Sequence, residues 1–463
     1  MIPVTSRNRQ HLAVFGLGAS GRAAAHALAA GGARVSAWDD KDDSREAARA
    51  EKIPLVDPVA LDWTDVDALV LSPGVPLTHP VPHPAVRLAA DAQRPVIGDI
   101  ELLREACPDA LLIGITGTNG KSTTSALIHH VLRACGWPVQ IGGNFGPPVL
   151  GLTPPAEGEA IVLELSSYQL DLTQTATFDV AVLLNITPDH LDRHGDMDGY
   201  VAAKTRIFRP AKERGGDRRQ VAVIGIDDGY CRTIYEDLSR SDAWLAIPVS
   251  VSHAVAGGVH VLDGTLFDSL DAETPRDWNI DGIDTLRGSH NWQNAAVAWA
   301  VARVQGLAPA EIAAALRSFP GLPHRLELIA EIDGVRYVND SKATNGEAAA
   351  RALGSCGDIF WIAGGVAKQD GLAPTDPWLD RVRHVFLIGE SAADFERHIA
   401  GRVPVTRSHN LARAVADATA LATPGSTVLL SPACASFDQY PNFVARGAHF
   451  RTLVEAIAEG DAA

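Results

Sequence analysis

A glycine-rich segment near residue 120 has the residue types that bind a nucleotide phosphate. It reads Thr-Gly-Thr-Asn-Gly-Lys-Ser-Thr over 116–123, after an expected strand at 111–115 and before an expected helix at 124–133. Backbone N–H groups of such a turn face an anion, Lys121 can reach the β- and γ-phosphates, and Ser122 can coordinate Mg²⁺. Position 115 is Ile where the strict pattern has Gly. The segment therefore predicts a variant phosphate loop for ATP, with an ordinary glycine-rich turn as the alternative.

A second glycine turn lies near the N-terminus. Gly-Leu-Gly-Ala-Ser-Gly at 16–21 follows an expected strand at 12–15 and precedes an expected helix at about 21–30. A second strand, expected at 34–38, ends at Asp39. This arrangement matches the dinucleotide-binding fingerprint, in which the turn meets a diphosphate and the acidic residue meets a ribose. Taken alone, the turn predicts NAD and an oxidoreductase.

Composition limits the classes of partner. The 463 residues are 46% hydrophobic, which at the usual domain size suggests about three domains with sizeable cores. The formal charge of −16 disfavours sequence-independent binding to nucleic-acid phosphate. Five widely spaced cysteines without a Cys-x-x-Cys pair indicate neither a zinc site nor a disulfide framework. With no long apolar run, we expect a cytoplasmic protein that binds neither membrane nor nucleic acid.

Alternating strands and helices indicate an α/β protein with mostly parallel sheets. The expected domains are an N-terminal Rossmann-like domain at 1–102, a central domain with a P-loop ATPase-like sheet at 103–320, and a C-terminal Rossmann-like domain at 321–463. Residues 240–287 are expected to form short β pieces, because Gly-Gly, Asp-Gly and Pro interrupt them. Further strands and a final helix are expected as follows: 160–165, 180–184, 335–338, 359–363, 385–388, 427–430 and helix 442–458.

The whole chain resembles the Mur ligases. The phosphate loop is shared by these ligases and the folylpolyglutamate synthases, and five further motifs follow in family order: Glu-Leu-Ser-Ser-Tyr-Gln-Leu at 164–170, Asn-Ile-Thr-Pro-Asp-His-Leu-Asp-Arg at 185–193, Gly-Leu-Pro-His-Arg at 321–325, Asn-Asp-Ser-Lys-Ala-Thr-Asn at 339–345 and Ser-Pro-Ala-Cys-Ala-Ser-Phe-Asp at 431–438. These look most like the members that add D-glutamate. The resemblance implies that ATP phosphorylates a carboxylate of UDP-N-acetylmuramoyl-L-alanine and that D-glutamate attacks the acyl phosphate, in peptidoglycan synthesis for cell shape and division.

The resemblance implies a catalytic and metal site in the central domain. Glu164 and His190 would hold Mg²⁺ together with Ser122, and Lys204 would carry a CO₂-derived carbamate that helps to bind a second Mg²⁺. On residue type alone, Lys204 would be expected to face solvent. Glu164 could be a solvated residue at a strand end, and Asp192 and Arg193 could be surface charges. The implied catalytic residues are Lys121, His190, Lys204 and Lys342.

The same resemblance distributes the ligand contacts. ATP would be bound by Gly117, Thr118, Asn119, Gly120, Lys121, Ser122, Thr123, Asn291, Asn294, Arg325 and Asp340. The UDP end of the substrate would be bound by Ala19, Ser20, Asp39, Ser72, Gly74 and Asn144, and the amino acid by Thr344, Lys368, Ser436 and the backbone near Phe443. Asn291 and Asn294 could instead cap a helix, and the turn around Asp340 could simply be exposed.

Three positions depart from the family. Lys41 stands where the family often has Arg, and Val366-Ala367 stand where it usually has Asp and a small residue.

A monomer is expected. The alternatives are a sister ligase with another amino acid such as L-glutamate, a folylpolyglutamate synthase-like ligase, the NAD oxidoreductase and a nucleotide sensor without turnover. The oxidoreductase leaves the phosphate loop unexplained.

Overall fold

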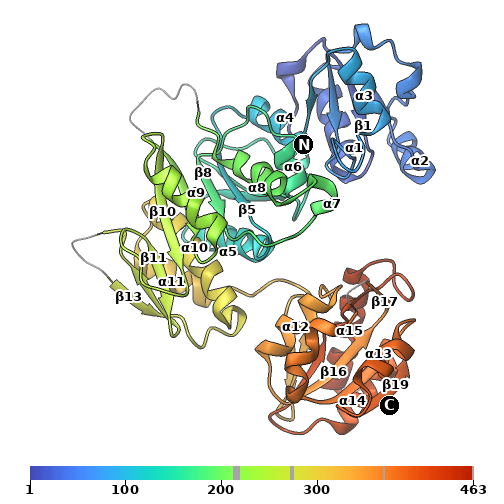
Figure 1. Cartoon of the computed structure of the whole chain (residues 1–463), viewed down its shortest axis with the longest axis vertical. Coiled ribbons are helices and arrows are strands. Elements are labelled where there is room, and N and C mark those ends of the chain that lie inside the picture. The colour runs from blue at the N-terminus through green and yellow to red at the C-terminus, as the bar shows by residue number, and fades with distance from the viewer. Residues whose placement is uncertain (212–218, 272–275, 369–370, 461–463) are drawn as a thin grey trace. The chain divides into compact units, whose positions relative to one another are not determined.

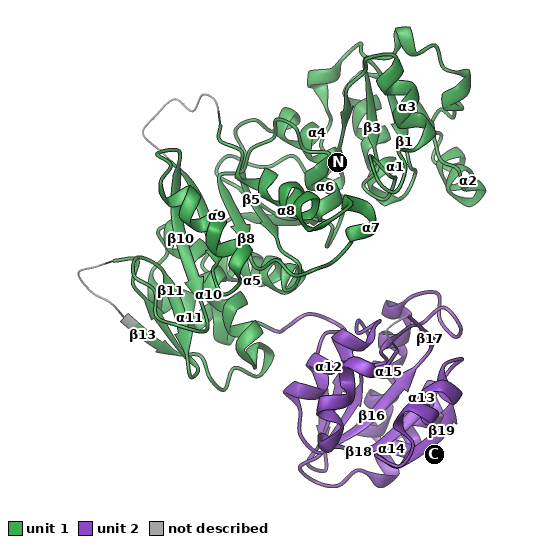
Figure 2. Ribbon diagram, in the orientation of Figure 1, with its two compact units in different colours: residues 1–319 green, residues 320–463 purple. Residues whose placement is uncertain are grey.

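Strands and helices alternate along most of the chain, and the strands form three main sheets (Figure 1). The computed structural model describes residues 1–211, 219–271, 276–368 and 371–460. The chain separates into two compact units, residues 1–319 and 320–463 (Figure 2). No helix within the described ranges is both long and apolar enough to cross a membrane. The prediction of an α/β fold with mostly parallel sheets is confirmed.

The first sheet is parallel, with the strand order β2-β1-β3-β4. Every residue of β1 and β3 is buried, as expected for a parallel sheet covered on both faces. The strand expected at 34–38 is confirmed, and the first helix begins at Ala19, two residues earlier than expected. The elements are β1 His11–Phe15, α1 Ala19–Ala30, β2 Arg34–Trp38, α2 Asp42–Ala50, β3 Ala68–Leu71, α3 Pro84–Asp91, β4 Val96–Ile97 and α4 Asp99–Ala106.

The second sheet has nine strands in the order β13-β12-β11-β10-β9-β8-β5-β7-β6. It is parallel except where β12 pairs with β11 and β13, so the β pieces expected at 240–287 extend one edge. Its strands are β5 Leu111–Thr116, β6 Val139–Gly143, β7 Ala160–Glu164, β8 Val180–Leu183, β9 Gln220–Gly225, β10 Trp244–Ser250, β11 Val259–Leu262, β12 Thr265–Asp268 and β13 Arg276–Asn279. Its helices are α5 Lys121–Ala134, α6 Ser167–Asp171, α7 Leu191–His194, α8 Met197–Thr205, α9 Gly229–Ser239, α10 Ser289–Val304 and α11 Pro309–Arg317.

The unit of residues 320–463 contains a six-stranded sheet, β14-β15-β20-β16-β18-β19, in which only β14 is antiparallel. The two faces of this sheet carry separate apolar clusters. The short strands β17 and β21, which follow β16 and β20 along the chain, pair with each other in a separate two-stranded ladder. The elements are β14 Glu327–Ile332, β15 Val335–Asn339, α12 Gly346–Ser355, β16 Ile359–Gly364, β17 Val366–Ala367, β18 Val382–Ile388, α13 Ala392–Ile399, β19 Val405–His409, α14 Leu411–Leu421, β20 Thr427–Leu430, β21 Cys434–Ala435 and α15 Phe443–Glu459.

Short 3₁₀ helices complete the described elements: η1 Thr5–Arg7, η2 Pro58–Ala60, η3 Trp63–Asp65, η4 Val149–Gly151, η5 Arg206–Phe208, η6 Asp284–Leu286 and η7 Ala373–Arg381. The predicted site residues follow the carboxyl ends of parallel strands, including β1 and β3, β5 and β7, and β15 and β20. This is the edge where ligands bind in open α/β sheets. The topology therefore gathers residues that are distant in sequence along a single edge of each sheet.

Candidate active site

The phosphate loop connects β5, which lies inside the nine-stranded sheet, to α5. Gly120 adopts a left-handed backbone with φ of 85°, and an added Cβ would lie 2.6 Å from Asn294 Oδ1. Glycine is therefore required there both for the turn and for the close packing of Asn294. Asn185 fixes the loop from the neighbouring strand end, because its Oδ1 accepts the Asn119 N–H at 2.9 Å. The helix begins at Lys121, three residues before the predicted start.

Two lysine side chains converge on one carbonyl of this loop. Lys121 Nζ donates to Gly117 O at 2.9 Å and to Thr118 O at 2.8 Å. Lys204 Nζ, from α8, donates to the same Gly117 O at 2.8 Å. The Lys204 residue is only 1% exposed, and burial, followed by the charge of Lys121, lowers its pKa to about 7. The pocket therefore favours a neutral Lys204 amine or a bound anion that offsets the two cations.

Glu164 ends β7 next to the loop. Its Oε1 accepts the Asn144 side-chain N–H at 2.6 Å, and its Oε2 is buried without a hydrogen-bond partner. A buried carboxylate oxygen without a donor suits a cation. No group of three or more His, Cys, Asp and Glu side chains in the described part of the chain could hold a metal. Any cation at Glu164 must therefore use other oxygens as well, such as hydroxyl, carbamate or phosphate oxygens.

His190 precedes α7 with a left-handed backbone, φ 53°, and its side chain is about half exposed. Its Nε2 lies 3.4 Å from an Asp189 carboxylate oxygen, and its ring centroid lies 5.0 Å from that of Tyr168. Burial lowers the pKa of His190, Asp189 opposes this, and the charges of Lys121 and Lys204 lower it further. The two lysines and His190 thus lie close enough to interact, and a neutral imidazole is the form that binds a metal.

The two asparagines of α10 form a network beneath the phosphate loop. Asn294 is 3% exposed, accepts the Thr124 hydroxyl at 3.0 Å and donates to Asn291 Oδ1 at 3.1 Å. Asn291 Nδ2 donates to Arg287 O at 3.0 Å. The structure therefore places both residues beside α5, where they support the loop. Their contact with adenine stays a prediction.

The N-terminal glycine turn lies where the strand order reverses, between β1 and β3. Asp39 Oδ2 accepts the Leu17 N–H at 2.6 Å, and Ser72 Oγ donates to Gly16 O at 2.6 Å. Both predicted ligand residues thus shape the turn. Gly21 is required for close packing, since an added Cβ would lie 1.8 Å from Gly16 O. Ala19 and Ser20 begin α1, whose first N–H groups face the ligand side of such turns.

Arg193, on α7, connects the segment after His190 to this N-terminal turn. Its guanidinium donates to Gly74 O and Val75 O, each at 3.1 Å, and lies 4.5 Å from the centroid of the Tyr168 ring. These contacts exclude the interpretation of Arg193 as a simple surface charge. The turn at Ser72-Pro73-Gly74 is therefore held by the same α7 segment that follows His190.

In the C-terminal unit, Asp340 is 7% exposed and follows β15. Its oxygens accept the Ser431 hydroxyl at 2.8 Å and the Leu326 N–H at 3.2 Å, and burial raises its pKa to about 7. The Lys342 N–H donates to His324 O at 3.0 Å, which ties its turn to the segment that carries Arg325. The structure thus brings together the C-terminal residues predicted to contact ATP.

Two of the predicted amino-acid residues follow the strands of the β17–β21 ladder. Lys368 follows β17 and is exposed, whereas Ser436 follows β21 and is buried. Phe443 begins α15, and Lys342 Nζ lies 4.0 Å from the centroid of its ring. Thr344 lies just before α12. The ladder therefore links the segments that carry the predicted cation and the predicted hydroxyl.

Comparison with known proteins assigns the chain to a family. The Mur ligase middle domain matches residues 115–302, and the Mur ligase glutamate ligase domain matches residues 324–434. A UDP-N-acetylmuramoylalanine–D-glutamate ligase of Rhodospirillum rubrum is 48% identical over all of this chain and 98% of its own. The chain belongs to the Mur ligase family. A relative of the same name from Caulobacter vibrioides is 47% identical over 99% of this chain and 98% of its own.

Solved Mur ligase structures share this fold. A Mur ligase of Thermotoga maritima determined in complex with ADP superimposes with a TM-score of 0.58 at 16% identity, covering 99% of this chain and 97% of its own. The UDP-N-acetylmuramate-alanine ligase of the same organism gives 0.57 at 16% identity, covering 97% of this chain and 99% of its own. At these identities the likeness establishes the fold alone.

The sequence did not indicate a role for Asp99 or Arg446 of this Mur ligase, and it left Arg193 as a possible surface charge. Arg446 on α15 is 1% exposed and donates to Ser341 Oγ at 3.0 Å, Ser341 O at 2.8 Å and Cys434 O at 3.0 Å. It therefore joins the turn before Lys342 to the strand before Ser436. No local pattern indicates this, because an Arg on a helix is usually exposed.

Proposed function

We propose that this Mur ligase joins D-glutamate to UDP-N-acetylmuramoyl-L-alanine at the expense of ATP. The observation that carries the proposal is the convergence of Lys121 and Lys204 on Gly117 O, beside the unpartnered Glu164 Oε2. This arrangement suits a polyanion together with a cation. The sequence relatives named as D-glutamate ligases, which match essentially the whole chain, supply the substrates. They also favour UDP over NAD as the ligand of the N-terminal turn.

Each of the three proposed domains would bind a different substrate. Residues 1–102 would bind UDP through Ala19, Ser20, Asp39, Ser72 and Gly74, with Asn144 contributing from the central domain. Residues 103–320 would bind ATP, and residues 321–463 would bind the amino acid. Asn144 donates to Glu164, so a sugar nucleotide bound by Asn144 would lie next to the proposed metal ligand.

Binding of ATP follows from the loop. The backbone of residues 117–123 and the N-terminus of α5 provide donors for the phosphates, and Lys121 supplies a charge at the same turn. Arg325 and Asp340 would contribute from the C-terminal unit, Asp340 through the ribose and Arg325 and Lys342 through phosphate charge. Asn291 and Asn294 would complete the adenine side.

Two Mg²⁺ ions would be held by Ser122, Glu164, His190 and a carbamate on Lys204, where they would offset the negative charge of the phosphates. The fit rests on the orphaned Glu164 oxygen and on the lowered pKa of Lys204. Only a neutral amine can attack CO₂, forming an N–C bond and releasing a proton. The burial of Lys204 makes that form available near neutral pH.

The chemistry is a two-step exchange at the alanyl carboxyl group. A carboxylate oxygen attacks the γ-phosphorus of ATP, and ADP leaves. The amine of D-glutamate then attacks the acyl carbon, an amide bond forms, and inorganic phosphate departs with the oxygen that had attacked. Lys121 and Lys342 would stabilise charge on the transferred group, and exclusion of water would protect the acyl phosphate.

The incoming amino acid would be held through its two carboxylates. Lys368 and Thr344 would bind the α-carboxylate, and Ser436 with the backbone near Phe443 would bind the side-chain carboxylate. Arg446 supports this site, because its hydrogen bonds to Ser341 and Cys434 fix the two segments that present these donors. We further propose a cytoplasmic monomer that acts in peptidoglycan precursor synthesis.

The test is ADP release from ATP and Mg²⁺ with UDP-N-acetylmuramoyl-L-alanine, across D-glutamate, L-glutamate, L-lysine and meso-diaminopimelate. Product mass is measured in parallel. We expect turnover and ligated product with D-glutamate only. Turnover with another amino acid would overturn the specificity, and no turnover with any of them would overturn the proposed reaction.

A further inference from the structure

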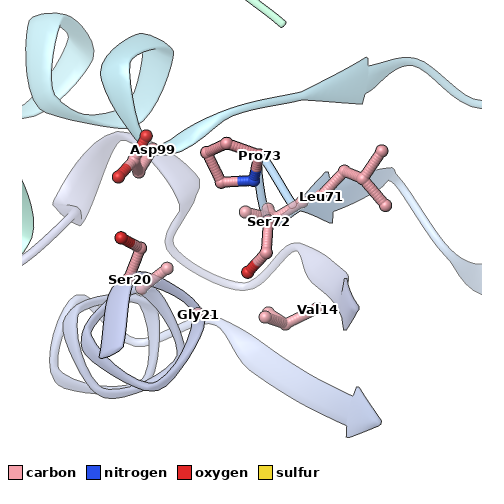
Figure 3. A pocket seen from close by; sticks show the side chains of 9 residues that line it. Val14, Ser20, Gly21, Leu71, Ser72, Pro73 and Asp99 are labelled. Atoms are coloured by element: carbon pink, nitrogen blue, oxygen red, sulfur yellow. The ribbon is translucent and has the colours of Figure 1, made fainter. Parts of the chain in front are cut away.

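A buried carboxyl group without a partner lies behind the N-terminal glycine turn. Asp99 is the first residue of α4 and is 4% exposed. Both of its carboxyl oxygens are buried and accept no hydrogen bond. They face a small cavity of about 10 Å³, which is room for about one water molecule. Figure 3 shows Asp99 across this cavity from Ser20, with Ser72 and Pro73 on a third side.

A second buried carboxylate on the same helix does have hydrogen-bond partners, so the unpartnered carboxyl group of Asp99 is unusual. Glu101 is 3% exposed, yet its oxygens accept the N–H groups of Gln174, Thr175 and Ala176 and the hydroxyl of Thr175. Glu101 thus joins α4 to the segment after α6. An ionised carboxylate left unpaired at such depth is costly unless it is neutralised. Asp99 is therefore in a position that structural support alone does not explain.

Among the described residues that line the cavity, none carries a charge that could offset that of Asp99. Val14 of β1, Leu71 of β3 and Pro73 contribute apolar surface, and α1 contributes Ser20 and Gly21. Burial raises the pKa of Asp99 to about 6. The nearby Gln169 amide of α6 and the backbone N–H groups of Asp99 and Ile100 partly oppose this, although none of them makes a hydrogen bond to its oxygens. No ionisable side chain is among them.

The cavity adjoins the turn that is assigned to the substrate diphosphate. Ser20 and Ser72 belong both to that assignment and to the cavity lining. A diphosphate brought to this turn adds negative charge close to the Asp99 carboxyl group, in a region with few compensating donors. Repulsion between two anions is strong where water is excluded. Neutral Asp99 removes the repulsion.

We propose that Asp99 couples binding of the nucleotide-sugar substrate to uptake of one proton. The inference rests on the proposed assignment of UDP to the N-terminal domain. Asp99 acts as a positioning residue that must be neutral when the diphosphate is bound. Affinity therefore falls as pH rises through the range in which free Asp99 ionises, and the complex binds more protons than the free protein does.

The experiment is isothermal titration calorimetry with UDP-N-acetylmuramoyl-L-alanine, without ATP, at about pH 8, in two buffers with different ionisation enthalpies. Its diphosphate is a diester and its alanyl carboxylate ionises at much lower pH, so the ligand itself does not titrate there. The variant is Asp99→Asn, which keeps the size and removes the charge. The control is Asp65→Asn, since Asp65 is exposed and pairs with Arg34 before β3, at the opposite end of that strand from the cavity.

We expect the full chain and Asp65→Asn to take up close to one proton per ligand, and Asp99→Asn to take up close to none. The dissociation constant of the full chain should rise by up to about tenfold per pH unit above pH 6, whereas that of Asp99→Asn should stay flat. If Asp99→Asn does not fold, Asp99→Ser provides the same test. Equal proton uptake in the full chain and the Asp99 variant overturns the inference. Absence of binding by the full chain overturns the UDP assignment itself.

Discussion

Replacing Lys204 with Met tests the buried lysine through both stability and activity. The substitution keeps an unbranched side chain of nearly the same length and removes the charge. The lost hydrogen bond is to Gly117 O, which still accepts from Lys121 at 2.9 Å, so no buried carbonyl is left unpaired. Lys204→Met is therefore expected to stabilise the protein while it abolishes turnover.

The magnitude follows from the buried charge. Burial lowers the pKa of Lys204 from 10.5 to about 7. At about 1.4 kcal/mol per pH unit, this corresponds to about 5 kcal/mol of unfavourable free energy at neutral pH. Loss of the hydrogen bond offsets about 1 kcal/mol of the gain. We expect the free energy of unfolding to increase by about 3–4 kcal/mol near pH 7.

The pH dependence has a defined sign. Between the folded pKa of about 7 and the unfolded pKa of about 10.4, the unfolded chain binds more protons at Lys204 than the folded chain does. Stability of the unsubstituted protein therefore rises over this range, by about 1.4 kcal/mol per pH unit from this group. The advantage of Lys204→Met should shrink by the same amount per unit as the pH rises.

The assay is urea unfolding at several pH values between about 7 and 9 in CO₂-depleted buffer, with ADP release measured in parallel. Lys41→Met is the control for stability, because Lys41 is exposed. Turnover of Lys204→Met should fall at least about a hundredfold. A variant less stable than the parent, or a stability difference that does not change with pH, would refute the reasoning.

Three further substitutions test individual contacts. Glu101→Gln should lower the free energy of unfolding by about 2–3 kcal/mol in urea titrations, because an amide cannot accept all four bonds of the carboxylate. Arg193→Met should raise KM for the sugar nucleotide about tenfold, with kcat changed less, because the turn at Gly74 loses its brace. Arg446→Lys should raise KM for D-glutamate about tenfold and leave KM for ATP little changed, since the single nitrogen of an ammonium cannot occupy the positions of both donor nitrogens of the guanidinium. An unchanged KM for D-glutamate in this variant would contradict the prediction.

The phosphate loop could be predicted because its signal is local. Glycine spacing, Lys121 and Ser122 specify the turn within a few residues, and the structure places the turn between β5 and α5 as expected. The helix starts were less predictable. Both α1 and α5 begin earlier than expected, because residues of the glycine turns themselves enter the first helical turn.

Burial of charged residues could not be predicted from spacing. Lys204 on a helix would by residue type face solvent, yet α8 presents it to Gly117, which is 87 positions away. Asp99 and Arg446 are buried by contacts between segments that are equally remote, and Arg193 reaches a turn 119 positions earlier. Such contacts depend on how sheets and helices pack. The residues next to a position in the sequence do not specify this packing. Family resemblance located Lys204 and placed Arg193 in a shared motif without a role, but gave no indication of Asp99 or Arg446.

The central claim is that an acyl phosphate forms at the alanyl carboxyl group. Its most direct test uses UDP-N-acetylmuramoyl-L-alanine labelled with ¹⁸O in that carboxylate, with ATP, Mg²⁺ and D-glutamate, and mass analysis of the inorganic phosphate released. The account predicts one ¹⁸O atom in each phosphate, because the attacking carboxylate oxygen leaves with phosphorus. Unlabelled phosphate accompanying ligated product would contradict it.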